Sequence, residues 1–415
     1  MENVPHTKKP FRFLVWLLLL VLIFFVVEKS AIVPSIKTLF SPLSRVASPE
    51  PANVSFPIET PAPIDPPPPP LPAHITTPSE VRGVYLTEWS AGNPKTIDRI
   101  LDMANTTDIN TVVIDIKDAT GRIAYQPTDP ILAAVGSGSS RIKDIQALTD
   151  TLHEHGIYTI GRVVVFEDPL YSSLHPEDTF TDTRTDTPWR NYKGITWLRP
   201  DSEAVWGYIS EIAHDAYAQG VDEINLDYVR FPSDGELQFI KDRPDTATRE
   251  TIMGQFFSFL DEHVRGDGIP LSADLFGLTM SATDDLGIGQ TLEVVAPHVD
   301  VVCPMVYPSH FALGSYGIAA PATKPYEVVH RALSDGIAKL SAINIGPEKL
   351  RPWLQDFDLL GVPYTATEVS AQIQATTDVG LSSWLMWDPK NTYTPAAFHL
   401  EPTQDATLQS AINNQ

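Results

Sequence analysis

The stretch EINLDYVRFPSD (residues 223–234) has the composition of a buried β-strand that ends at its proline. Side chains alternate between the two faces of a strand, so Ile224, Leu226 and Tyr228 are expected to face covering helices. Asp227 is expected on the opposite face, near the carboxyl end of the strand. A buried carboxylate is unfavourable unless it is paired or used in a reaction. Asp227 is therefore the first candidate for a functional residue.

Seven other runs share this apolar, β-branched character, and amphipathic segments separate them. The eight strands are expected at residues 81–89, 111–118, 158–166, 223–231, 270–276, 299–307, 350–357 and 380–388. Helices are expected at residues 95–105, 143–155, 203–219, 247–265, 325–340 and 367–379, with a shorter one within 289–298. Eight β–α units in about 310 residues predict an α/β fold, the parallel (β/α)8 TIM barrel. A doubly wound sheet is the main alternative, but TEWSAGNPKT after the first strand lacks the glycine-rich phosphate turn typical of that fold.

An uncharged apolar run, FLVWLLLLVLIFFVV, occupies residues 13–27. Its length of 15 residues lies between a signal-peptide core and a full membrane span. Lys29 stands where a small residue is expected for cleavage, which favours an uncleaved transmembrane anchor. The basic residues Lys8, Lys9 and Arg12 predict a cytoplasmic N-terminus and an outward-facing domain. A cleaved signal peptide is the alternative, and both interpretations predict an exported protein.

Residues 31–79 are rich in proline, serine, alanine and threonine, with PAPIDPPPPPLP as the low-complexity centre. Such a composition cannot form a hydrophobic core and favours extended polyproline II segments. We therefore expect a disordered stalk between the membrane and the barrel. The expected order along the chain is an anchor at 1–30, the stalk at 31–79, the barrel domain at 80–400 and a C-terminal tail at 401–415.

The formal net charge of the chain is −23 at pH 7. Nucleic acid is not expected as a partner, because phosphate binding needs clustered lysine and arginine. The acidity also fits a solvated surface with no partner. The one cysteine, Cys303, lies in the apolar run VDVVCPMVYP, so we expect a buried structural thiol and no intramolecular disulfide.

Polar and aromatic side chains gather at the carboxyl ends of the expected strands, where TIM barrels carry their active sites. They are Glu88, Trp89, Asp115, Lys117, Asp118, Arg162, Glu167, Asp168, Asp227, Arg230, Asp274, Tyr307, Ser309, His310, Trp353, Gln355, Asp356, Trp387 and Asp388. A single carboxylate at such a position usually caps a helix or pairs with an arginine. Many such groups around one barrel mouth indicate a functional site. In a purely structural role, the desolvation free energy of each buried charge would have to be offset by other interactions.

Paired carboxylates flanked by aromatic side chains are typical of glycoside hydrolysis, in which one carboxyl protonates the leaving oxygen and the other attacks the sugar or activates water. Asp227 and Asp274 occupy similar positions in adjacent expected strands, so they are the predicted catalytic pair. The chain has no GxSxG or HExxH motif. His153 and His155 are two residues apart on a helix and do not share a face. No metal or other cofactor is predicted, since the spacing of the strand-end aspartates does not demand a divalent cation either.

Eight ordered blocks carry a resemblance to a known family: VRGVYLTEWSAG, VVIDIKDATGRIAY, IGRVVVFEDP, INLDYVRFPSDG, SADLFGL, CPMVYPSHF, RPWLQDF and GLSSWLMWDP. Across residues 80–395 they resemble the DUF4015 group of glycoside hydrolases. The resemblance implies a TIM barrel distantly similar to α-amylase-like enzymes, with Asp227 as nucleophile or base. It implies Asp274 as the acid, although amylase-like barrels carry glutamate there, with Asp388 as the reserve candidate. Glu167 lies at a position that is often lysine in this group, which argues against Glu167 as the acid.

These observations together predict a membrane-anchored, outward-facing glycoside hydrolase that acts on a cell-envelope or extracellular polysaccharide. The residues expected to bind the substrate or to orient the carboxylates are Glu88, Trp89, Asp115, Lys117, Arg162, Arg230, Tyr307, His310, Trp353, Gln355, Trp387 and Asp388. A non-catalytic glycan-binding barrel is the alternative, because a fold does not imply a function. A transmembrane scaffold for protein contacts is a third hypothesis, which the polar strand ends disfavour.

Overall fold

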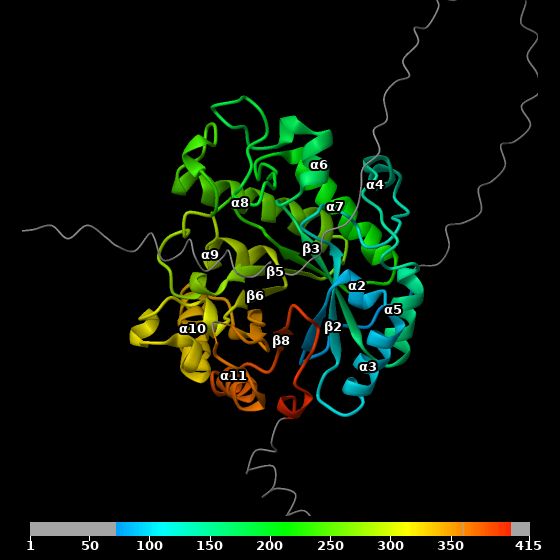
Figure 1. Ribbon diagram of the computed structural model, residues 1–415, viewed down its shortest axis with the longest axis vertical. Helices are drawn as coiled ribbons and strands as arrows, with labels where there is room; N and C mark the ends of the chain where they lie inside the picture. Colours follow the sequence, from blue (N-terminus) through cyan, green and yellow to red (C-terminus); the bar gives the residue numbers. More distant parts are fainter. Residues whose placement is uncertain (1–71, 360, 400–415) are drawn as a thin grey trace, which may run out of the picture. The chain divides into compact units, whose positions relative to one another are not determined.

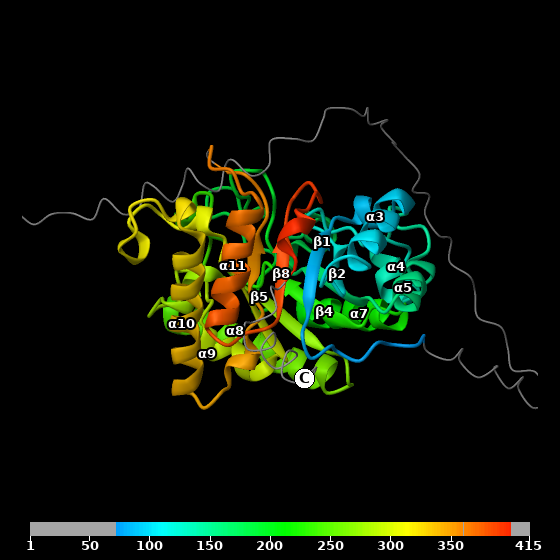
Figure 2. The same ribbon diagram turned by 90° about the horizontal axis from the view of Figure 1, so that it is seen from below.

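Eight short strands form a closed parallel barrel in the computed structural model, which describes residues 72–359 and 361–399 (Figure 1). They are β1 (Arg82–Leu86), β2 (Thr111–Lys117), β3 (Tyr158–Val164), β4 (Glu223–Asp227), β5 (Leu271–Phe276), β6 (Val301–Met305), β7 (Trp353–Gln355) and β8 (Trp384–Trp387). Each strand pairs with the next along the chain, and β8 closes the barrel beside β1 (Figure 2). The predicted TIM barrel is confirmed.

Helices between the strands surround the barrel (Figure 1). The longer ones are α3 (Pro94–Ala104), α5 (Ile145–Glu154), α7 (Glu203–Ala218), α8 (Thr246–Leu260), α10 (Pro325–Ala342) and α11 (Ala366–Asp378). The shorter ones are α2 (Glu88–Ala91), α4 (Pro130–Val135), α6 (Pro169–Leu174) and α9 (Leu292–Val295). α9 was expected, whereas α2, α4 and α6 are too short to show a periodic apolar pattern in the sequence.

Apolar side chains pack both outside and inside the barrel wall. The outer core lies between the strands and the helices and includes Ile114 and Leu226. The inner core fills the barrel and includes Tyr158, Trp353 and Cys303. Burial raises the pKa of the Cys303 thiol to about 12, so the thiol is unreactive at neutral pH, as the sequence predicted.

The first strand ends earlier than the sequence predicted. Thr87 follows β1 and caps α2, because its hydroxyl oxygen accepts a hydrogen bond from the backbone N–H of Ser90. Glu88 and Trp89 therefore lie on a short helix after β1 and not at the end of a strand.

The fourth strand is also shorter than the expected span 223–231. Tyr228, the residue after β4, has a φ of 54°, which lies in the left-handed region and cannot continue a strand. β4 therefore stops at Asp227, and Arg230 lies on the loop that follows. The prediction of a strand as far as Phe231 was wrong, because the local sequence gives no sign of this turn.

The first described residues, 72–79, contact the barrel although they were expected to belong to the disordered stalk. The backbone N–H of Ile75 donates to Asp222 Oδ1 at 2.9 Å. His74 Nδ1 lies 3.3 Å from the same oxygen, and His153 Nε2 lies 2.9 Å from Asp222 Oδ2. Asp222 directly precedes β4, so this segment packs at the amino-terminal end of the barrel, opposite the strand ends that carry the candidate site.

The predicted anchor, the stalk up to residue 71 and the C-terminal tail at 401–415 lie outside the described residues. Within residues 72–359 and 361–399, no helix combines the length and the apolar character that crossing a membrane requires. Anchoring and export stay predictions.

Candidate functional site

Arg162 is the centre of a buried charge cluster at the carboxyl ends of β2, β3 and β4. Its guanidinium donates to Asp115 Oδ1 at 2.5 Å. Through Nε and one terminal nitrogen it also donates to Asp227 Oδ2, at 3.0 and 2.5 Å. The Arg162 side chain is only 7% exposed, so water screens these ion pairs weakly. The cluster joins three adjacent strands through charges that the sequence predicted for this end of the barrel.

Both oxygens of Asp227 have defined partners. Oδ2 accepts the two Arg162 bonds, and Oδ1 accepts a hydrogen bond from the backbone N–H of Tyr228 at 2.6 Å. The left-handed backbone of Tyr228 accompanies this contact. Such a conformation is costly for a bulky aromatic residue and is concentrated at functional positions in proteins. The turn therefore marks Asp227 as a residue whose position is fixed by its surroundings.

Asp274 on β5 lies beside the cluster. Its Oδ1 accepts hydrogen bonds from Asn225 Nδ2 at 2.9 Å and Trp353 Nε1 at 2.7 Å. Arg162 Nε lies 4.0 Å from Asp274 Oδ2 and 3.0 Å from Asp227 Oδ2, so these two carboxyl oxygens are no more than about 7 Å apart. The paired carboxyls of glycosidases are about 5–9.5 Å apart. Burial, together with the charge of Asp227, raises the pKa of Asp274 well above its usual range. The structure thus brings the two predicted carboxyls together and favours the protonated form of Asp274.

An aromatic wall borders the cluster at β1, β7 and β8. The Tyr85 hydroxyl donates to Asp115 Oδ2 at 2.6 Å, and the Tyr85 ring stacks on Trp387 with centroids 3.9 Å apart. Trp353 meets the Trp387 ring edge-on at 5.5 Å, and the Arg162 guanidinium lies 5.2 Å from the Trp387 centroid. Sequence reasoning missed Tyr85, although the two-residue alternation of β1 carried the information.

Neutral hydrogen-bonding groups follow β6 and face β7. Ser309 Oγ donates to Gln355 Oε1 at 2.9 Å, and the rings of Tyr307 and His310 meet edge-on at 5.3 Å. Burial lowers the pKa of His310 to about 4, so its imidazole is neutral at physiological pH. Burial and the charge of Asp274 raise the pKa of Tyr307. These uncharged groups suit hydrogen bonds to sugar hydroxyls.

Helix α2 adds an acidic group and an exposed indole near the cluster. Glu88 Oε1 and Asp118 Oδ2 lie 2.6 and 2.8 Å from one nitrogen of Arg141. Burial raises the pKa of Glu88 to about 7, and the charges of Asp115 and Asp118 contribute to the rise. The side chain of Trp89 is 66% exposed, with the Arg141 guanidinium 4.9 Å from its centroid. Trp89 therefore offers a free face on which a sugar ring can stack.

Lys117 does not orient the carboxylate pair as the sequence analysis expected. Its Nζ lies 2.9 Å from Asp168 Oδ2 and donates to the backbone oxygen of Val164 at 2.5 Å, and its side chain is fully buried. The register between β2 and β3 shifts between Asp115 and Lys117, which breaks the alternation on which the expectation rested. Lys117 instead pairs with Asp168, the residue that caps α6.

Arg230 and Asp388 also have partners other than the carboxylate pair. Arg230 donates to Ser233 Oγ at 3.0 Å, and its guanidinium lies 4.7 Å from the ring centroid of Trp197. Asp388 accepts the backbone N–H of Lys390 at 2.8 Å and holds the turn after β8. Local turn contacts, which strand-end position alone does not reveal, account for both residues.

Glu167 is a buried carboxyl near the cluster that the sequence analysis set aside. Burial raises its pKa to about 7, against the opposing charges of Arg230 and Lys193. The negative charges of Asp234 and Asp227 add to the rise, so Glu167 lies within electrostatic reach of the cluster. In the sequence, Glu167 stands in FEDP directly after the third expected strand, and this position could have identified it as a candidate site residue.

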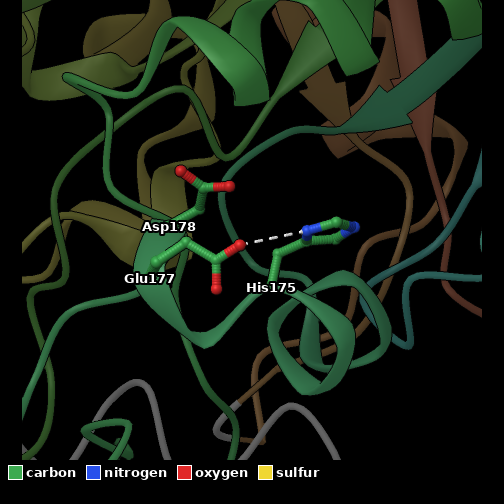
Figure 3. Close-up of side chains that lie close together, drawn as sticks. All are labelled: His175, Glu177 and Asp178. Atoms are coloured by element: carbon green, nitrogen blue, oxygen red, sulfur yellow. Dashed lines mark hydrogen bonds and ion pairs between the residues drawn. The ribbon is translucent and has the colours of Figure 1, made fainter.

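One cluster of potential metal ligands occurs among the described residues, on the loop after α6. Ligand atoms of His175, Glu177 and Asp178 all lie within 4.8 Å of one another, and His175 Nδ1 approaches Glu177 Oε1 at 3.3 Å (Figure 3). Asp178 Oδ1 already accepts the hydroxyl of Ser202, the residue that caps α7, at 2.6 Å. Helix capping and a partly exposed histidine–glutamate contact account for this group, so it supports no metal site.

Comparison with known proteins identifies the relatives of this barrel. A family model with the description "Putative glycosyl hydrolase domain" (DUF4015) matches residues 83–393. The PgaB (BpsB) glycoside hydrolase domain from Bordetella bronchiseptica aligns over 78% of this chain and 100% of its own, with 13% identity and a TM-score of 0.57, which shows a shared fold. A hypothetical protein from Ruminiclostridium thermocellum is 34% identical over 46% of this chain and 96% of its own, with a TM-score of 0.42. A search of curated proteins finds no match.

Proposed function

Because the chain belongs to the DUF4015 family of glycosyl hydrolase domains, we propose that it hydrolyses a polysaccharide through the carboxylate pair Asp227 and Asp274. The observation that carries the proposal is the placement of both carboxyls around Arg162. Asp227 is ion-paired, whereas burial favours the protonated form of Asp274. Glycoside hydrolysis requires this division between a charged and a protonated carboxyl.

In this proposal Asp227 is the reacting carboxylate, as nucleophile on the sugar or as base for water. Arg162 pairs with Asp227 and holds it in place through two N–H groups. Asp115 fixes the far side of the guanidinium and is itself held by the Tyr85 hydroxyl. Asp274 is the protonated partner, and two N–H donors fix its Oδ1.

The proposed substrate is a polysaccharide of the cell envelope or the extracellular space. Trp387 and the exposed Trp89 supply aromatic faces for sugar rings. Tyr307 and His310 supply neutral hydrogen-bonding groups. Gln355, which was expected to bind substrate, is fully buried and bonded to Ser309 and Phe357 instead. The basic and apolar N-terminal sequence supports an outward-facing enzyme tethered to the membrane.

One observation favours glycan binding without hydrolysis as a second candidate function. Both oxygens of Asp227 are engaged, one by Arg162 and the other by the backbone N–H of Tyr228. Strong hydrogen bonds to both oxygens reduce the nucleophilicity of a carboxylate. A binding protein would keep the aromatic wall and the neutral hydrogen-bonding groups and lose only the turnover.

Hydrolysis by the purified protein on a panel of envelope and extracellular polysaccharides tests the proposal. The comparison includes Asp227→Asn and, as a matched control, Asp335→Asn on the outer helix α10. We expect reducing ends from the wild type and from Asp335→Asn, and a rate at least about 10²-fold lower for Asp227→Asn.

Two results would count against hydrolysis at this pair. Equal rates for the wild type and Asp227→Asn would remove Asp227 from the mechanism. Glycan binding of equal strength in both proteins, without release of reducing ends, would establish the binding function instead. Release of the domain into the soluble fraction after deletion of residues 1–30, but not before, would test the anchor.

A further inference from the structure

The backbone around Glu167 is fixed by hydrogen bonds at the carboxyl end of β4, the strand that carries the proposed reacting carboxylate. It lies three residues after the end of β3 and pairs with Trp197 in an antiparallel bridge. The backbone N–H of Val165 donates to the carbonyl oxygen of Asp227 at 2.8 Å, which ties this part of the chain to the end of β4. The position of Glu167 relative to Asp227 is therefore set by the barrel wall and not by a free loop.

The carboxyl of Glu167 is enclosed but has no partner of its own. The residue is 4% exposed, and no hydrogen bond or ion pair joins its carboxyl oxygens to any residue in 72–359 or 361–399. Neither oxygen of the Glu167 carboxyl is completely enclosed, so both oxygens remain accessible to a small molecule such as water. A buried carboxyl without a partner is unfavourable in a purely structural role.

The groups that face Glu167 come from two loops and from β4. Arg230 and Asp234 lie on the loop after β4, Lys193 lies on the segment between α6 and α7, and Asp227 ends β4. Burial is the largest cause that raises the pKa of Glu167 to about 7; Arg230 and Lys193 oppose the rise, and Asp234 and Asp227 add to it. A carboxyl with that pKa is partly protonated at neutral pH, as a general acid must be.

Asp274 is less accessible to a substrate than Glu167. Asp274 is 1% exposed, and its Oδ1 is already bonded to Asn225 and Trp353 inside the barrel. A proton donor must come within hydrogen-bonding distance of the glycosidic oxygen. The unpartnered oxygens of Glu167 satisfy this requirement better than the enclosed carboxyl of Asp274.

We propose that Glu167 is the catalytic acid that protonates the glycosidic oxygen, and that Asp274 is a neutral positioning residue for Arg162 and Asp227. This inference rests on the proposed hydrolase function, in which it replaces Asp274 by Glu167 as the protonated partner of Asp227. It reverses the expectation that the family resemblance gave for Glu167, since this chain carries a carboxyl where lysine is common.

In the proposed step the proton moves from the Glu167 carboxyl to the glycosidic oxygen as the bond from that oxygen to the anomeric carbon breaks. The bonding electron pair stays on the leaving oxygen, which departs as a hydroxyl group. Asp227 either bonds to the anomeric carbon or takes a proton from the water that attacks it. In the first case water later releases the sugar and returns its proton to the Glu167 carboxylate.

The test compares Glu167→Gln, Glu167→Asp and Asp274→Asn with the wild type, with Glu177→Gln as an exposed control on the loop after α6. The substrates are a polysaccharide that the wild type hydrolyses and the phenyl and 2,4-dinitrophenyl glycosides of the sugar it releases. Dinitrophenolate leaves without protonation, so loss of the acid hardly affects the step that breaks the glycosidic bond of that substrate. Thermal unfolding verifies that each variant is folded.

We expect Glu167→Gln to lose about 10²–10⁴-fold in kcat/KM on the polysaccharide and the phenyl glycoside, but less than about 10-fold in kcat/KM on the dinitrophenyl glycoside. The decline of the wild-type rate near pH 7 should disappear with the dinitrophenyl substrate. Glu167→Asp should lie between the wild type and Glu167→Gln, and Glu177→Gln should match the wild type.

The outcomes separate the two proposals. If the wild type hydrolyses the polysaccharide and Glu167→Gln is unimpaired, the role of Glu167 is refuted while the hydrolase function stands. If Asp274→Asn shows the leaving-group pattern instead, Asp274 is the acid. If the wild type hydrolyses no member of the panel, the hydrolase function fails and the role of Glu167 fails with it.

Discussion

Replacing Arg162 by methionine tests whether this arginine holds the charge cluster together. The change removes the cation that bonds Asp115 and Asp227 and retains a side chain of similar length. Removal of one partner from a buried ion pair costs about 3–5 kcal/mol, because the other charge stays buried without compensation. Asp115 keeps the Tyr85 hydroxyl and Asp227 keeps the Tyr228 N–H, so we expect about 4 kcal/mol at pH 8.

The loss of stability in Arg162→Met should shrink as the pH falls. Arg162 lowers the pKa of Asp115, which burial raises, so without the guanidinium the folded-state pKa of Asp115 rises further above that of the unfolded chain. A carboxyl whose pKa is raised by folding binds its proton more tightly in the folded state, so stability decreases as the pH rises through that range. Each such proton changes the stability by about 1.4 kcal/mol per pH unit, so at pH 5 we expect about half the loss seen at pH 8.

Urea unfolding followed by tryptophan fluorescence and circular dichroism measures these values. Arg331→Met on α10 is the matched control, because Arg331 forms an exposed pair with Asp335 that is worth at most about 0.5 kcal/mol. An equal loss for Arg162→Met at pH 5 and pH 8 would assign the effect to packing and not to charge. A loss below about 1 kcal/mol would show that the two carboxylates reach water without the arginine, which would refute the buried cluster as the basis of the site.

Three further predictions follow from buried carboxylates. Asp274→Asn should be at least as stable as the wild type at pH 8. Because folding raises the pKa of Asp274, the wild type should lose stability as the pH rises, and the variant should lose less. Urea unfolding between pH 5 and 8 measures this difference. Lys117→Met should destabilise by about 3–5 kcal/mol, because Asp168 loses its buried partner, and the folded variant should keep its hydrolytic rate. Asp222→Ala should free residues 72–79, so hydrogen exchange should become faster there and at Thr159 of β3, whose backbone N–H also donates to Asp222, while the other barrel strands stay protected.

The sequence was sufficient for the barrel and for most of its candidate site. Eight β-branched runs separated by amphipathic segments carry local periodicities, and parallel strands bring their carboxyl ends to one face of a barrel. For that reason Asp115, Arg162, Asp227 and Asp274 could be grouped before their contacts were known. Trp353, whose indole N–H bonds Asp274, was also among the predicted strand-end residues.

Only the tertiary structure decided which of the strand-end side chains act together. The register shift in β2 turns Lys117 toward Asp168, and the left-handed backbone of Tyr228 ends β4 at Asp227. Both features depend on how neighbouring strands and loops pack, and neither has a local sequence signature. The protonation state of Glu167 likewise depends on burial and on the charges of residues from loops that are distant along the chain. Sequence periodicity determines which face of an element a residue occupies, whereas partners and protonation depend on atoms that are close in space and distant along the chain.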